Sequence, residues 1–426
     1  MNTLRIVQLG DVHWPDKASQ QLADIKDRAF PQNVLERVTQ NALQAVVREV
    51  RAQMEEKCHA VLFCGDLTSR GDASGYKACA SYLVKALGLS TWNVRKLHAV
   101  PGNHDVDRAR IDPTGEHFFD KFASCRGAWE ALNLPILAVE RFRRADLSNG
   151  KRCRAAVFSL NSSIGCGEQR HLPSQIRTEL DALLKTYSST ATPEAAFALL
   201  GETLDTPAFL PEDVEGICRE IKKLDLTALP IVLAHHNILP QSLPRVELYT
   251  ELLNAGVARS RLSRMQRPLL YCHGHIHDYP LEIVHEPQFP GSRVVCVSAP
   301  ELAQGFNLLR VEFGSKGFPL GCRVGTYRLD HHNGEVRPVE TRVPLCLPDQ
   351  WGVGPLADDR VPRLLSILPN SDMRVGDLHE SAVQQQFALT MDQLADLLAE
   401  AEWLGAVHIT NREESPEHRS VRRVTR

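Results

Sequence analysis

Several features that define specialised protein classes are absent from this sequence. None of its 11 cysteines forms a C-x-x-C pair, and they are scattered through apolar runs such as "VLFCG" and "VVCV", which is typical of reduced, buried thiols and not of a disulfide framework. No apolar run approaches the ~20 residues that cross a bilayer, and no charged-then-apolar leader precedes the first strand-like run. Internal repeats and low-complexity segments are absent too. We therefore expect a cytoplasmic protein without a membrane partner.

A strong excess of one charge is also lacking. The net charge of −3, with 24% charged residues, argues against a general electrostatic hold on nucleic acid, although it leaves room for a local basic groove. The 43% of apolar residues are enough to build a full core. A length of 426 residues favours one large unit with a smaller appendage.

The sequence does contain many short apolar runs rich in Val, Ile, Leu and Phe. They occupy residues 4–10, 59–65, 96–100, 155–160, 229–236, 268–274 and 293–300, and helical patterns at 33–56 and 74–87 lie between the early ones. Strands that are apolar on both faces and alternate with helices predict an α/β fold with covered sheets. In such folds functional residues collect at the carboxyl ends of the strands.

The pattern divides the chain into a large domain, residues 1–329, and a small C-terminal one. Within the large domain, residues 106–154 and 165–228 are mostly helical in pattern, and their size predicts cap insertions beside the functional edge. Residues 330–362 are rich in Pro and Gly and predict a linker. Residues 363–418 predict a helix, a turn, a helix and a β-like "AVHI", an order that resembles a winged helix. A basic tail, 419–426, is expected to be disordered.

The second C-terminal helix has clear local signals. Thr390 and Gln393 match a capping box, an apolar helical spacing runs to Leu404, and Gly405 suits the helix end. A DNA-reading helix should be basic, but residues 392–403 carry four carboxylates and no Lys or Arg. We therefore expect this module to contact a protein partner or a second copy, with nucleic-acid binding as the alternative.

Polar residues of metal-binding types follow five of the apolar runs. In chain order they are Asp11-Val12-His13, Gly65-Asp66, Gly102-Asn103-His104-Asp105, His235-His236 and Gly274-His275-Ile276-His277. Carboxylate, imidazole and amide groups suit Mn²⁺, Fe or Zn²⁺ and require no thiolate. We expect the glycines to permit the tight turns that bring these ligands to one point.

The motifs "DVH", "GD", "PGNHD" and "GHIH", in this order, resemble those of calcineurin-like metallophosphoesterases over about residues 4 to 313. The resemblance implies a layered sandwich of two mixed β-sheets flanked by helices, and a hydrolase of phosphoric esters. The stretches "LNSS" (160–163) and "HLPSQIRTELDALL" (171–184) further resemble small bacterial cyclic-nucleotide phosphodiesterases.

The resemblance also implies a dinuclear site. One ion would be held by Asp11, His13 and His277, the other by Asn103, His235 and His275, with Asp66 bridging both. A hydroxide between the ions would attack the phosphorus in line. His104 would act on the leaving oxygen as proton donor or charge stabiliser, and Asp105 would orient its imidazole. Mn²⁺ is favoured, with Fe, Ni²⁺ or Zn²⁺ as alternatives.

The function expected from these residues is hydrolysis of a phosphodiester, in a cyclic nucleotide, another nucleotide or nucleic acid. A phosphomonoesterase on the same site is the near alternative. Two further alternatives are a catalytically silent binding scaffold and a nucleic-acid-binding regulator. No substrate-binding residue is assigned, but we expect residues 106–228 to govern substrate choice.

Other polar features have simpler interpretations. Residues 141–154 carry six Lys or Arg against one Asp and could hold a polyphosphate, but a solvated hairpin around "SNGK" is favoured. Residues 259–267 are equally basic, as expected near a helix C-terminus. His236 and His273 adjoin predicted ligands; we expect them to face the other side of their strands, and support of a ligand is the alternative.

Overall fold

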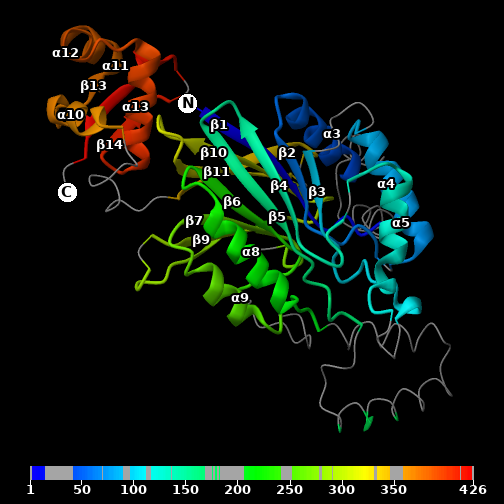
Figure 1. The fold of residues 1–426 in the computed structure, drawn as a ribbon. Coiled ribbons are helices and arrows are strands. Elements are labelled where there is room, and N and C mark those ends of the chain that lie inside the picture. Colours follow the sequence, from blue (N-terminus) through cyan, green and yellow to red (C-terminus); the bar gives the residue numbers. More distant parts are fainter. Residues whose placement is uncertain are drawn as a thin grey trace.

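The protein is described by a computed structural model of all 426 residues (Figure 1). The residues whose structure is described are 2–14, 42–69, 71–89, 96–111, 117–135, 137–167, 175, 178–179, 182, 206–240, 252–277, 281–289, 291–330, 333–345, 358–412 and 414–424. Among them, no helix is both long enough and apolar enough to cross a membrane.

Two six-stranded mixed sheets form the body of the molecule. The first has the order β12-β11-β10-β1-β2-β3, with β1 (Asn2–Leu9), β2 (Ala60–Phe63), β3 (Leu97–Ala99), β10 (Gly305–Phe313), β11 (Pro319–Leu329) and β12 (Val336–Pro344). The second has the order β4-β5-β6-β7-β9-β8, with β4 (Arg143–Asn149), β5 (Cys153–Ser159), β6 (Ala228–Leu233), β7 (Pro268–His273), β8 (Leu281–Val284) and β9 (Arg293–Ser298). The parallel strands β1–β3 and β5, β6, β7 and β9 supply the carboxyl ends that matter below.

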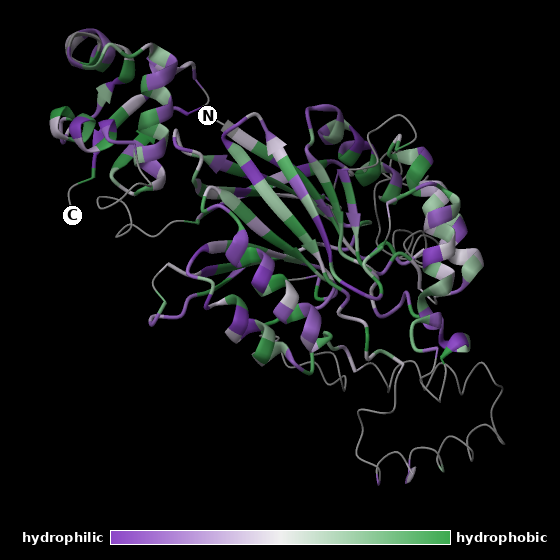
Figure 2. Cartoon of the chain, viewed as in Figure 1, coloured by the Kyte–Doolittle hydropathy of each residue, from purple (hydrophilic) through white to green (hydrophobic). Residues whose placement is uncertain are grey.

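The sheets pack face to face and helices cover their outer faces, which confirms the predicted α/β sandwich. Strand β1 shows the arrangement: Leu4 and Ile6 lie in the core between the sheets, whereas Val7 and Leu9 lie in the core under the helices. The first sheet is covered by α3 (Ala42–Glu55), α4 (Ala73–Ala86) and α5 (Ala123–Ala131), and the second by α8 (Pro211–Lys223) and α9 (Ala255–Leu262). Figure 2 shows the apolar strands in the centre and helices of mixed polarity outside. Short 3₁₀ turns, η2 (Arg108–Arg110) and η3 (Asp120–Phe122), precede α5.

Each of the seven predicted strand runs contains a strand, and both helical patterns contain a helix, α3 and α4. Residues 33–41 of the first pattern lie outside the described residues. The ten described cysteines are all buried and free, as the sequence predicts.

Four segments differ from the linker, insertions and tail expected from the sequence. Residues 336–344 of the expected linker form β12, an edge strand whose prolines and exposed charges hide the strand pattern. Residues 143–149 of the first expected insertion form the edge strand β4, and residues 211–223 of the second form α8, which packs on the second sheet. Residues 420–423 of the expected tail form β15, because Val421 is buried in the C-terminal core.

The C-terminal residues 358–424, here called the C-terminal unit, have a core of their own. Their elements are α10 (Arg360–Ile367), β13 (Met373–Arg374), α11 (Val375–Leu378), a π-helical turn (His379–Val383), α12 (Gln384–Phe387), α13 (Met391–Trp403), β14 (Val407–Thr410), η6 (Pro416–His418) and β15 (Ser420–Arg423), with a sheet of order β13-β15-β14. The predicted capping box of Thr390 and Gln393 begins α13, and Gly405 follows it with a φ of 65°.

Helix α13 docks the C-terminal unit onto the first sheet. The Trp403 ring packs so closely on β11 that a Cβ at Gly321 would lie 2.3 Å from it. The indole N–H donates to Glu312, and the Arg342 guanidinium lies 4.4 Å from the ring centroid. Figure 1 shows the unit beside the β10–β11 end of the sheet. Trp403 is therefore the anchor of this interface.

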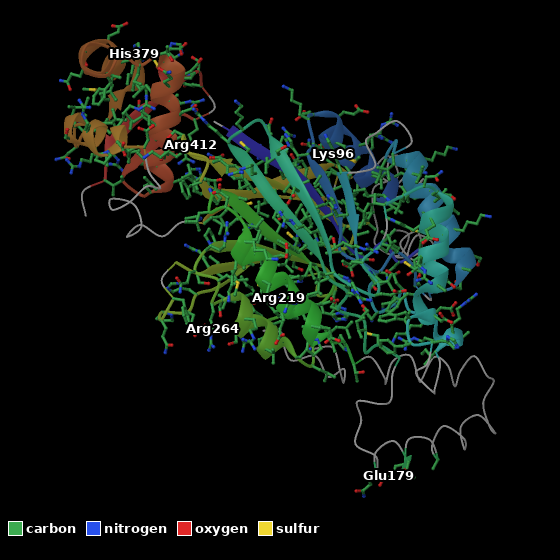
Figure 3. All side chains as sticks on the ribbon, viewed as in Figure 1. Lys96, Glu179, Arg219, Arg264, His379 and Arg412 are labelled. Atoms are coloured by element: carbon green, nitrogen blue, oxygen red, sulfur yellow. The ribbon has the colours of Figure 1, made fainter. Side chains whose placement is uncertain are left out.

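Two carboxylates of α13 complete the docking. Glu400 is buried and accepts hydrogen bonds from the Ser315 backbone N–H and hydroxyl, each at 3.1 Å, in the turn after β10. Glu402 pairs with Arg342 of β12 at 3.3 Å and with Arg412. Figure 3 labels Arg412 in this unit. Two of the four acidic residues of this helix therefore have partners within the same chain.

Replacing Trp403 by Ala should loosen this interface. Truncating a buried Trp costs about 3 kcal/mol or more, which corresponds to about a hundredfold faster amide exchange at the interface. Hydrogen–deuterium exchange should rise in α13 and in the β10–β11 turn and stay unchanged in β6 and β7. Asp392→Asn, an exposed change on the same helix, is the control. Unchanged exchange in Trp403→Ala would show that the unit is held by other contacts.

Candidate metal centre

The five polar motifs meet at the carboxyl ends of parallel strands from both sheets. Asp11 follows β1, Asp66 follows β2 and Asn103 follows β3, all in the first sheet. His235 follows β6 and His275 follows β7, in the second sheet. The candidate centre thus lies where the two sheets adjoin, so it depends on their mutual packing.

One cluster joins Asp11, His13 and His277, whose ligand atoms all lie within 4.8 Å of one another. His277 Nε2 is 3.0 Å from Asp11 Oδ1, and His13 Nε2 is 4.0 Å from the same oxygen. Asp11 also accepts the backbone N–H of His275 at 3.1 Å. This carboxylate therefore ties the two ends of the G-H-I-H motif to the first sheet.

A second cluster surrounds His235. Its Nε2 lies 3.0 Å from Asn103 Oδ1 and 3.2 Å from Asp66 Oδ2, and its Nδ1 lies 2.7 Å from the Cys64 carbonyl oxygen. Asp66 Oδ2 is also 3.9 Å from His13 Nε2. Asp66 thus stands between the two clusters, at the place where a bridging ligand would lie.

Five of the nine predicted site residues hold left-handed backbone conformations. Their φ angles are 49° for Asp11, 47° for His13, 52° for Asp66, 67° for His275 and 61° for His277. Such angles are uncommon outside glycine and cost free energy that the surrounding structure must supply. Strain of this kind gathers at functional sites, which supports a functional interpretation of the whole cluster.

The motif glycines serve close packing more than turning. A Cβ at Gly102 would lie 2.0 Å from Asp66 Oδ1, one at Gly274 would lie 2.5 Å from Asp11 Oδ2, and one at Gly65 would lie 2.7 Å from His235 Nδ1. Only Gly65 of the three has a positive φ, of 98°. Each glycine therefore leaves space for a candidate ligand that follows another strand.

Gly102→Ala should displace Asp66 and weaken metal binding, because a methyl group would overlap its carboxylate. We expect the metal content of the purified protein to fall together with activity, while the fold persists. Elemental analysis and circular dichroism measure the two effects. Gly127→Ala in α5, where no atom lies within 4 Å of the added Cβ, is the matched control. Full metal content in Gly102→Ala would contradict this packing argument.

Burial and charge act on the protonation of the cluster. Burial alone raises the pKa of Asp66, but neighbouring His235 and His104 lower that pKa well below its usual range. Burial likewise opposes the charge of His235, yet Asp66 and Asp11 raise the pKa of this imidazole to about 9. Burial, aided by the charge on His235, lowers the pKa of His275 to about 3. A positive charge is thus favoured between the carboxylates, and His275 keeps a free lone pair.

The donor set suits divalent cations. Asp11 and Asp66 are buried carboxylates, and the groups around them are imidazoles and an amide oxygen. His275 Nε2 is buried and has no hydrogen-bond partner among the described residues. A bound cation would satisfy that nitrogen and the buried negative charge together.

His104 lies on the solvent side of this cluster. Its side chain is exposed, and its ring centroid is 4.9 Å from that of His13. The backbone N–H of His104 donates to Asp66 Oδ1 at 2.9 Å, and its Nδ1 lies 3.1 Å from the Ser69 carbonyl oxygen. The ring therefore stands next to the candidate metal ligands without facing the buried side of the site.

Asp105 does not take the predicted place beside the His104 imidazole. It is fully buried and accepts hydrogen bonds from the Thr68 N–H at 3.1 Å and the Gly102 N–H at 2.9 Å. Burial, followed by the nearby Asp66 charge, raises its pKa to about 6. Asp105 shapes the loop, and the Ser69 carbonyl holds the His104 ring.

His236 belongs to the site, contrary to the sequence-based interpretation. It forms a third candidate cluster with His235 and His275, and its ring centroid is 4.6 Å from that of His275. Burial lowers the pKa of His236 well below its usual range, and His275 and His235 lower it further. Ser162 Oγ lies 2.9 Å from His236 Nδ1. His273 is absent from the candidate clusters found in the described part of the chain.

The basic segment 141–154 forms the predicted hairpin, β4 and β5 with a turn at Gly150. Arg144 pairs with Asp146 and Glu220, and Arg154 pairs with Asp225. Of the second basic cluster, Arg264 lies on the outer surface beside α9 (Figure 3). Neither observation indicates a phosphate-binding site.

Comparison with known proteins identifies the family. A search of curated proteins finds no match. Solved structures that match include GAP50, the anchor in the inner membrane complex of Plasmodium (12% identity, TM-score 0.41, 81% of this chain and 90% of that chain). Purple acid phosphatase PPD1 from yellow lupin seeds (12%, 0.46, 81% and 54%) and a 5'-nucleotidase precursor from Thermus thermophilus (15%, 0.36, 79% and 55%) also match, and this chain spans just over half the length of each. Residues 4–279 match the family model described as calcineurin-like phosphoesterase. The chain belongs to the calcineurin-like phosphoesterase family.

Proposed function

We propose that this protein is a dinuclear metal-dependent phosphoesterase that hydrolyses a phosphodiester in a cyclic nucleotide, another nucleotide or nucleic acid. The observation that carries the proposal is the position of Asp66, a buried carboxylate between two clusters of imidazole and carboxylate ligands. A scaffold without catalysis would have no reason to keep both clusters in strained backbone conformations.

The ligands divide as the family resemblance implies. Asp11, His13 and His277 would hold one cation, Asn103, His235 and His275 would hold the other, and Asp66 would lie between them as a shared ligand. When bound, two divalent cations, with Mn²⁺ favoured and Fe, Ni²⁺ or Zn²⁺ as alternatives, activate water and neutralise charge on the phosphoryl group. Asn103 contributes a neutral oxygen, which limits the negative charge that a phosphate must approach.

His104 acts on the leaving oxygen. Its exposed ring beside His13 lies within reach of a bound ester, and the Ser69 carbonyl fixes one ring nitrogen. If Nδ1 carries the proton given to that carbonyl, protonation of Nε2 makes the ring a general acid. The imidazole of His13 beside it is a proposed metal ligand, so His104 is the candidate proton donor for the leaving group.

Diesterase activity is favoured over monoesterase activity because the "LNSS" stretch, which resembles cyclic-nucleotide phosphodiesterases, lies at the site. Ser162 contacts His235 and His236, and Ser163 donates to the Pro101 carbonyl beside the third motif. Residues 106–228 are the proposed determinants of substrate choice. Much of that range lies outside the described residues.

The test compares bis-p-nitrophenyl phosphate with p-nitrophenyl phosphate. Metal-stripped protein is resupplied with Mn²⁺, Fe²⁺, Ni²⁺ or Zn²⁺, and initial rates are measured. We expect metal-restored hydrolysis with a preference for the diester. A preference for the monoester would assign the protein as a phosphomonoesterase. Full activity in the metal-stripped protein would contradict the proposal altogether.

The C-terminal unit is proposed to contact protein and not nucleic acid. Two of the four α13 carboxylates are engaged by the first sheet, and the other two, Asp392 and Asp396, would face phosphates unfavourably. A gel-shift of the isolated residues 360–426 with duplex DNA at low salt should show no complex. A cytoplasmic location stays a prediction from sequence.

A further inference from the structure

His236 is buried at the site and is held by several hydrogen bonds. Its backbone N–H donates to Ser162 Oγ at 3.0 Å, and the Tyr271 hydroxyl donates to its carbonyl oxygen at 2.6 Å. Its Nδ1 lies 2.9 Å from the same Ser162 oxygen. The residue is 1% exposed, and its ring packs against that of His275. The orientation of the imidazole is therefore fixed on several sides.

The hydrogen bonds of Ser162 determine the direction of its contact with His236 Nδ1. A hydroxyl oxygen has two acceptor sites and one O–H. Both acceptor sites are used, by the backbone N–H of His235 at 3.2 Å and that of His236 at 3.0 Å. Only the O–H remains for the third contact, so Ser162 donates and His236 Nδ1 accepts.

This direction fixes the tautomer of His236. A neutral imidazole whose Nδ1 accepts a hydrogen bond carries its proton on Nε2. A nitrogen that carries a proton cannot bind a metal ion. In the cluster of His235, His236 and His275, two imidazoles can thus bind a metal ion, and the third, His236, can donate a hydrogen bond.

We propose that Ser162 sets His236 as an Nε2–H donor to an anionic oxygen of the bound phosphate ester, and that His236 is not a metal ligand. This inference rests on the proposed function and adds a substrate contact to it. A neutral donor stabilises the phosphoryl oxygens without competing with the cations for ligands. Ser162 is a positioning residue, because it acts through His236.

The experiment measures metal content and phosphate affinity, neither of which requires turnover. His236→Ala should keep the metal-to-protein ratio of the wild-type protein, by elemental analysis, and should bind inorganic phosphate about tenfold more weakly, by calorimetry of the Mn²⁺-loaded protein. Loss of one metal ion per chain in His236→Ala would overturn the inference, because it would make His236 a ligand. Unchanged phosphate affinity would overturn the substrate contact.

Ser162 variants test the positioning role. Ser162→Ala should weaken phosphate binding as His236→Ala does, and Ser162→Thr, which keeps the hydroxyl, should restore it. Long-range ¹⁵N–¹H correlation of the histidine rings, with His236→Ala for assignment, should show the Nε2–H form in wild type and Ser162→Thr. An Nδ1–H form in wild type would contradict the hydrogen-bond count. If the wild-type protein takes up no divalent metal, the proposed function fails first, and this inference falls with it.

Discussion

Asp66→Asn should lower kcat/KM by about a thousandfold or more. The change keeps the size of the side chain and removes the negative charge between the two clusters, 3.2 Å from His235 Nε2 and 3.9 Å from His13 Nε2. Metal ions supply several kcal/mol of charge stabilisation in phosphoryl transfer, and about 4 kcal/mol corresponds to that thousandfold loss. Because Asp66 is proposed to bridge, the variant should also lose metal, and the ratio of metal to protein should fall in parallel.

The control for this prediction is Asp146→Asn. Asp146 is an exposed carboxylate on β4 that pairs with Arg144, so the same chemical change occurs away from the site. We expect wild-type rates and metal content in the control. Surface ion pairs contribute little to stability, so its fold should be unaffected. Wild-type activity in Asp66→Asn itself would remove the central assumption of the dinuclear site.

The convergence of ligands at one edge could be predicted from sequence because each motif directly follows an apolar run. The carboxyl ends of parallel strands lie on one side of a sheet, so residues such as Asp11 and Asp66 had to be neighbours once both runs became strands. The capping box at Thr390 was equally accessible, because its contacts lie within four residues of one another. Local and periodic signals therefore gave the most reliable predictions.

Contacts between distant residues could not be predicted in this way. Asp105 faces the interior because it accepts a hydrogen bond from the backbone N–H of Thr68, which lies 37 residues away in the sequence. The place of His236 likewise depends on Ser162, which is 74 residues away. The sequence offers one signal, because two adjacent histidines follow a buried strand. In an extended strand their imidazoles would point to opposite faces, and the sequence alone cannot show that the chain bends so that both face the site.

The edges of the sheets were the other difficulty. Strand β12 has two prolines and mostly exposed side chains, so its pattern resembles a linker. Its place in the sheet is fixed by antiparallel pairing with β11, from Gly321 opposite Pro344 to Leu329 opposite Val336. Edge strands depend on a neighbour more than on their own apolar periodicity, and β8 is not predicted from the sequence for the same reason.

His104→Ala separates acid catalysis from metal binding. We expect the metal content to stay at the wild-type ratio, because the exposed ring lies outside the proposed ligand set. General acid catalysis contributes about 10²- to 10⁴-fold, so kcat should fall by that range for esters with a poor leaving group. A p-nitrophenolate leaving group needs little protonation, so the loss should be much smaller for bis-p-nitrophenyl phosphate. His408→Ala, an exposed histidine on β14, is the matched control and should retain both rates.

The dependence of the hydrolysis rate on the leaving group distinguishes the two possible roles of His104. Rates for a series of aryl phosphodiesters, plotted against the pKa of the leaving phenol, should become steeper in His104→Ala than in the wild-type protein, since the variant can no longer supply the proton. If His104 instead stabilises charge on the phosphoryl oxygens, the loss will be the same for every ester and the two slopes will agree. Loss of metal from His104→Ala would indicate that His13, Asp66 and His104 together bind a metal ion. His104 would then be a metal ligand and not the general acid.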